Sequence, residues 1–158
     1  MGGTPELRSG VTMRDMDSTR NASRETFEVD DSHWPVLRVT FTGSPDDTQF
    51  EAYLQVLEGM YERHCPVALL LDGTGIERLP PACLRRQASF LREKAELIRT
   101  YNVGTALVIN SSLLRALLRT LLALAPMPCE FRVFPDAVQG LVWCRARVAV
   151  ATSPRVNH

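Results

Sequence analysis

The chain lacks closely spaced cysteines, which excludes several classes of protein. Its four cysteines stand at positions 65, 83, 129 and 144, without the short spacings of zinc ligands or redox pairs. A chain of 158 residues is long enough to bury one hydrophobic core without disulfides. The cysteines therefore indicate reduced thiols in a cytoplasmic protein, and they predict neither a disulfide framework nor a metal site.

An excess of charge of one sign is also missing. Acidic and basic residues number 18 each, so no overall field attracts nucleic acid or an anionic membrane. Arg85, Arg86 and Arg92 form a local basic patch on a predicted helix, but Glu93 and Glu96 offset it. We therefore do not expect a nucleic-acid partner.

No hydrophobic run is long enough to cross a bilayer. The longest, residues 113–125, is shorter than the roughly 20 residues that a transmembrane helix needs, and it contains Arg115 and Arg119. The first residues do not form the apolar stretch of a secretory signal. We expect a cytoplasmic protein without a membrane span.

Residues that would support catalysis are scarce. The three histidines, His33, His64 and His158, have no recognisable partners, and no carboxylates are paired at strand ends. Residues 73–75 fit neither of the glycine-rich spacings that bind phosphates. The sequence therefore favours a non-enzymatic protein without a cofactor.

Composition divides the chain into three parts. Residues 1–25 are polar and lack apolar periodicity, so they predict a flexible N-terminal tail. Residues 151–158 predict a short flexible C-terminal tail for the same reason. The domain is predicted between them, at residues 26–150.

Strand and helix patterns alternate through this domain. Residues 27–29 and 35–42 predict an antiparallel hairpin, since Leu37, Val39 and Phe41 alternate with polar residues. Further strands are predicted at 67–71, 105–109 and 131–134. Helices are predicted from Ser44 as N-cap, from about 80 to 99, from 111 or 112 to 125, and over 136–148. The order ββαβαβαβα predicts an α/β fold with a mixed, largely parallel five-stranded sheet and four helices.

This order of elements resembles the STAS domain, the fold of bacterial anti-sigma-factor antagonists, and more narrowly the small bacterial sporulation-antagonist-like proteins related to CRAL-TRIO domains. The similar stretches are residues 34–39, 68–72 and 108–112, the last followed by Arg115. The resemblance implies a regulatory module that binds proteins. In STAS antagonists a phosphorylated serine begins the helix after the corresponding turn. Residues 77–82 contain no hydroxyl there, so the phospho-switch is not expected to transfer, and Thr74 lies at the turn instead.

Two groups of residues are candidates for binding a small ligand. Asp72 and Thr74 follow a central strand, where α/β folds often bind ligands. Ser111, Ser112 and Arg115 lie at a predicted helix N-terminus, which attracts anions. Each group also has a purely structural interpretation: an Asx-type turn for the first, and an N-cap beside a solvated arginine for the second.

The helix predicted at 113–125 is apolar on nearly every side. Leu114, Leu118 and Leu122 exceed what one sheet-facing stripe requires. The surplus could be covered by neighbouring helices, by a second subunit or by a lipid-like ligand. We therefore expect a regulatory or protein-interaction module that forms a homodimer through this helix. The alternative is a carrier or sensor of a small apolar or lipid-like ligand.

Overall fold

The computed structural model describes residues 26–154. Its elements are β1 (Phe27–His33), β2 (Val36–Gly43), α2 (Asp47–Tyr61), β3 (Val67–Ile76), α3 (Pro81–Glu93), α4 (Ala95–Tyr101), β4 (Asn102–Val108), α5 (Ser112–Leu124), β5 (Phe131–Phe134) and α6 (Ala137–Thr152). The predicted N-terminal tail, 1–25, lies outside the described residues. Helix α6 continues two residues past the domain end predicted at 150.

The five strands form one sheet in the order β1-β2-β3-β4-β5. Strand β1 pairs antiparallel with β2, and the other neighbours pair parallel. The predicted class, an α/β fold with a mixed and largely parallel five-stranded sheet, is therefore confirmed. The parallel pairs require crossover connections, which α2, α3 with α4, and α5 provide, while α6 follows the last strand.

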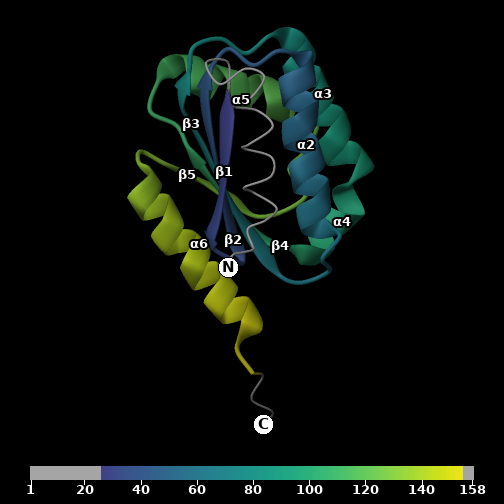
Figure 1. Cartoon of the computed structure of the whole chain (residues 1–158), viewed down its shortest axis with the longest axis vertical. Helices are drawn as coiled ribbons and strands as arrows, with labels where there is room; N and C mark the ends of the chain where they lie inside the picture. Colours follow the sequence, from purple (N-terminus) through teal and green to yellow (C-terminus); the bar gives the residue numbers. More distant parts are fainter. Residues whose placement is uncertain (1–25, 155–158) are drawn as a thin grey trace, which may run out of the picture.

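The helices divide unequally between the two faces of the sheet (Figure 1). Helices α2 to α5 cover one face, where Leu37, Val39 and Phe41 of β2 pack into the larger core cluster. Helix α6 covers the other face, where its Cys144 and Val148 meet Val36, Ala68 and Leu70. The alternation predicted for β2 thus matches its two environments.

The single helix predicted over about 80–99 is in fact two helices. Lys94 leaves the helical region with φ −105° and ψ 17°, and it separates α3 from α4. Leu91 and Ile98 lie on either side of the break and both join the same core cluster. Apolar spacing therefore continues across the break, which is why periodicity alone did not show it. The described residues thus contain five helices rather than four.

The first helix begins later than its sequence suggested. Its N-cap is Asp46 rather than Ser44. The Asp46 carboxylate accepts from Gln49 N at 2.8 Å, and the Gln49 side chain accepts from Asp46 N at 2.9 Å. This reciprocal capping box satisfies two backbone donors at once.

Strand β3 approaches β2 so closely at Gly75 that a side chain has no room. A Cβ atom built there lies 2.6 Å from the carbonyl oxygen of Phe41, a backbone atom that cannot simply rotate away. In contrast, a Cβ atom built at Gly59 on α2 meets nothing within 4 Å. The two glycines form a natural test pair.

We predict that Gly75→Ala lowers the free energy of unfolding by about 1–3 kcal/mol, because the clash forces β2 and β3 apart. Gly59→Ala should raise it by roughly 0.5–1 kcal/mol, because alanine loses less backbone entropy in a helix. Urea denaturation of both variants beside the wild type measures the two effects. Equal stability of the wild type and Gly75→Ala would contradict the close strand contact.

Candidate functional site

The carboxyl half of β3 holds the first pair of candidate residues. The strand was predicted to end at Leu71, but it continues to Ile76 after an irregularity opposite β2. Asp72 Oδ1 accepts from the backbone nitrogen of Thr74 at 3.0 Å and from its hydroxyl at 2.7 Å. Asp72 Oδ2 lies 3.7 Å from Nη2 of Arg38. The carboxylate is thus engaged within the chain, as the Asx-type interpretation expected.

The second candidate group lies at the start of α5. Ser111 is the N-cap, and its hydroxyl oxygen accepts from Leu114 N at 3.1 Å. Ser112 is the first helical residue and Arg115 is exposed. A Cβ atom built at Gly73 lies 3.8 Å from Leu114 Cδ2, so the end of β3 and the first turn of α5 approach each other. Ligand binding by Ser111, Ser112, Arg115, Asp72 or Thr74 stays a prediction.

The two serines should differ in their contribution to stability. We predict that Ser111→Ala lowers the free energy of unfolding by about 1 kcal/mol, because Leu114 N loses its acceptor. Ser112→Ala should change it by less than about 0.5 kcal/mol, as expected of an exposed substitution. Thermal denaturation followed by circular dichroism compares them. A larger loss of stability in Ser112→Ala than in Ser111→Ala would contradict the assignment of Ser111 as the N-cap.

The leucines of α5 turn mainly inward. Leu114 was predicted to lie at an interface. It is 6% exposed and packs with Leu107 and Ile109, so it belongs to the core instead. Leu118 and Leu122 are half-buried. The leucines that do project into solvent lie at the helix ends, Leu113 at 50% and Leu124 at 42% exposed. Part of the surplus apolar face is therefore covered by the chain itself.

Two neighbouring cavities lie between α5 and the sheet. The wider cavity has a volume of about 120 Å³ and reaches from β2 and α2 to the N-terminal half of α5. The narrower cavity, about 80 Å³, reaches toward α4 and the segment before β5. Both cavities share one wall, formed by Tyr53, Leu71, Gln87, Leu107, Leu118 and Leu121. Both are partly open to solvent.

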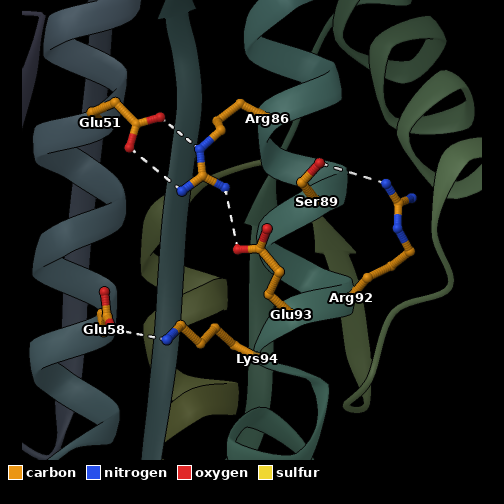
Figure 2. A network of polar contacts seen from close by, with 7 residues as sticks. All are labelled: Glu51, Glu58, Arg86, Ser89, Arg92, Glu93 and Lys94. Atoms are coloured by element: carbon orange, nitrogen blue, oxygen red, sulfur yellow. Dashed lines mark hydrogen bonds and ion pairs between the residues drawn. The ribbon is translucent and has the colours of Figure 1, made fainter.

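Polar side chains between α2 and α3 pair with each other instead of forming a basic surface (Figure 2). Arg86 Nε lies 2.6 Å from Glu51 Oε2, and Arg86 Nη1 lies 3.6 Å from Glu93 Oε1. Lys94 contacts Glu58 at 2.8 Å. Arg92 donates to the carbonyl oxygen of Leu124 at 2.8 Å. Two of the three arginines in the basic patch thus hold helices together.

The outer face of α6 is the most exposed apolar surface that the structure describes. Val138, Val142 and Val150 are 73%, 64% and 77% exposed. The sequence reasoning missed this surface, although a signal was present: residues 137–152 contain no polar stripe at helical spacing. An exposed apolar face of this kind is normally covered by another surface.

Three of the four thiols, the buried Cys83 and Cys144 and the half-buried Cys129, are poorly suited to nucleophilic chemistry. Burial raises the pKa of Cys144 to about 12, and it also raises the pKa of Cys83 and of Cys129. A thiol with a raised pKa is rarely in its reactive thiolate form at neutral pH. Within residues 26–154, histidine, cysteine and carboxylate side chains form no metal-like cluster. No described helix combines the length and hydrophobicity needed to cross a membrane.

Comparison with known proteins bears on the fold. No protein-family model and no curated protein matches the chain. Among solved structures, it is similar to an uncharacterized protein of the DUF3478 family with a SpoIIAA-like fold from Shewanella loihica. The TM-score is 0.55 at 17% identity, over 75% of this chain and 91% of that one. The chain has a SpoIIAA-like fold.

An anti-sigma factor antagonist from Mycobacterium paratuberculosis supports the same assignment. It aligns with a TM-score of 0.50 and 22% identity, over 76% of this chain and 93% of the other. The STAS fold expected from the sequence resemblance is therefore confirmed. At these identities the likeness establishes the fold alone, because one fold supports many functions.

Proposed function

We propose that this STAS-fold chain is a non-catalytic, regulatory protein-interaction module that self-associates through the outer face of α6. The anti-sigma factor antagonist of the same fold makes a regulatory role reasonable. The observation that carries the proposal is the exposed apolar stripe on α6, formed by Val138, Val142, Ala146 and Ala149.

The stripe follows directly from helix geometry. Its four residues are three or four positions apart, so they lie on one side of α6. On the opposite side, Gly140, Cys144 and Val148 are buried against the sheet. Solvent-facing positions of a single covering helix are normally polar. For an apolar stripe in that position, contact with another protein surface is more favourable than contact with water.

A second copy of the chain is a suitable partner, because the stripe is self-complementary. The register follows if two α6 helices pair antiparallel through their stripes and cross at the level of residue 144. In that register Val142 of one copy faces Ala146 of the other, whose small side chain permits close approach. Helix α6 stands apart from the other four described helices, so a second copy can reach it (Figure 1). Such a contact is small, and we expect a weak, reversible dimer.

The alternative interface on α5, predicted from its leucines, is less apolar. Its solvent side includes Arg115, Arg119 and Thr120 between the exposed Leu113 and Leu124. Desolvating those groups costs free energy unless the partner provides matching contacts. Self-association through α5 stays a prediction, and the following variants separate the two surfaces.

We predict that the wild type sediments as a concentration-dependent dimer and that Val142→Glu sediments as a folded monomer. The introduced carboxylate lies in the stripe, where dimerisation would remove it from water without a partner. Leu113→Glu is the matched control on α5 and should dimerise like the wild type. Analytical ultracentrifugation with circular dichroism measures both properties. A monomeric wild type, or a dimer broken only by Leu113→Glu, would contradict the proposed surface.

Salt provides an independent test of the α6 pairing. Arg145 lies at the edge of the stripe and is exposed. The antiparallel register brings the two copies of Arg145 to the same side, where they repel each other. Raising the ionic strength screens exposed charges, so dimerisation should strengthen from 0.05 to 0.5 M salt, over roughly the range in which the Debye length falls well below 10 Å. Arg145→Ala should dimerise more tightly and lose most of this salt dependence. Weaker dimerisation at high salt would indicate an attractive ionic interface instead.

A further inference from the structure

We infer that the two cavities beneath α5 form one binding site for a small, neutral, apolar molecule that carries a hydrogen-bond acceptor, such as an aryl ketone. This inference concerns the opposite side of the sheet from α6, so it does not depend on the proposed dimer. It rests on the size of the cavities, the absence of charge in their walls, and two polar groups that have hydrogens to donate.

Size comes first. Protein interiors are close-packed, and voids larger than a water molecule are few. The wider cavity, at about 120 Å³, is far larger than one water molecule requires. An apolar cavity of about 150 Å³ in another protein stays dry and binds benzene. The two cavities share a wall and together suit a substituted single ring, while a long lipid chain is too large.

The walls select against charge. No acidic or basic residue lines either cavity. Burial raises the pKa of Tyr53, Tyr61 and Cys129, so their side chains are neutral at physiological pH. A carboxylate or ammonium group placed here would lose its hydration without gaining an ionic partner, which is costly. The ligand is therefore a neutral molecule, unlike a fatty acid or a phospholipid headgroup.

The hydrogen-bonding groups select for an acceptor. Gln87 lies in the wall that both cavities share, and its Oε1 accepts from the Tyr53 hydroxyl at 3.0 Å. Among residues 26–154 its amide nitrogen has no acceptor. The Tyr61 oxygen in the narrower cavity accepts from Asn102 Nδ2 at 2.8 Å, and its own hydrogen has no acceptor in the described chain.

Acceptors in the same region are already used. Asn102 Oδ1 accepts from Gly104 N at 2.8 Å, and the Thr105 hydroxyl oxygen accepts from Asn102 Nδ2 at 3.0 Å. The site therefore offers N–H and O–H donors to a ligand but few free acceptors. A carbonyl or ether oxygen on an otherwise apolar molecule matches this arrangement. The surplus leucines of α5 would then form the apolar wall of a ligand site.

Three probes of similar ring size test the chemistry: acetophenone, ethylbenzene and benzoate. Titration of the isotopically labelled wild-type chain, followed by NMR, should show saturable binding of acetophenone and ethylbenzene. The shifts should concentrate on residues of the shared wall, such as Leu118 and Leu121. Benzoate should bind at least about tenfold more weakly than acetophenone, because its charge has no partner. Equal binding of benzoate, or no saturable binding of either neutral probe, would overturn the inference.

Two variants with matched controls locate the site. Leu118→Phe adds volume to the wall of both cavities and should weaken the binding of both neutral probes about tenfold or more. Leu122→Phe, half-buried on the same helix but outside both linings, should bind like the wild type. Tyr61→Phe removes a hydroxyl donor at similar size, while Asn102 Nδ2 keeps its hydrogen bond to Thr105. This variant should weaken the binding of acetophenone by about tenfold, the effect of one hydrogen bond, and leave the binding of ethylbenzene unchanged. Undiminished binding by Leu118→Phe would place the probes elsewhere and refute the site.

Discussion

The rest of the structure depends on the burial of β3 on both of its faces. Ala68 and Leu70 meet α6, while Leu69 points into the larger core beneath α2 to α5. A central strand with two apolar faces needs a cover on each side: the crossover helices between parallel strands form one cover, and the C-terminal helix α6 forms the other. Each of our proposals concerns one of these covers: the cavities lie beneath α5, and the apolar stripe lies on α6.

The two covers are unequal: one leaves unfilled space above the sheet, and the other leaves apolar side chains exposed to solvent. On the side of α2 to α5, ion pairs such as Arg86 with Glu51 join the helices, but the leucines of α5 do not fill the space above the sheet. On the other side, α6 alone covers the sheet and is apolar on its outer face too. A cavity and an exposed apolar stripe are costly unless something occupies or covers them. The first favours a small molecule and the second a protein.

Much of the fold could be predicted from residue patterns, because these report local periodicity and burial. The alternation in β2, the apolar run of β3 and the limits of β5 all correspond to the structure. The break at Lys94 could not be predicted, since apolar spacing continues across it. The candidate site was harder still: Asp72 and Ser111 could be singled out from the sequence, but their hydrogen-bond partners depend on the paths of neighbouring segments.

The sequence by itself determined the α/β class, the order of strands and helices along the chain and the alternation of β2, because these follow from local periods of two and 3.6 residues. Only the tertiary structure decided which apolar residues are covered. It placed Leu114 in the core, left Val142 in solvent and opened the cavities around Gln87. Coverage depends on which helices share a face of the sheet, and that is a property of packing between segments distant in sequence.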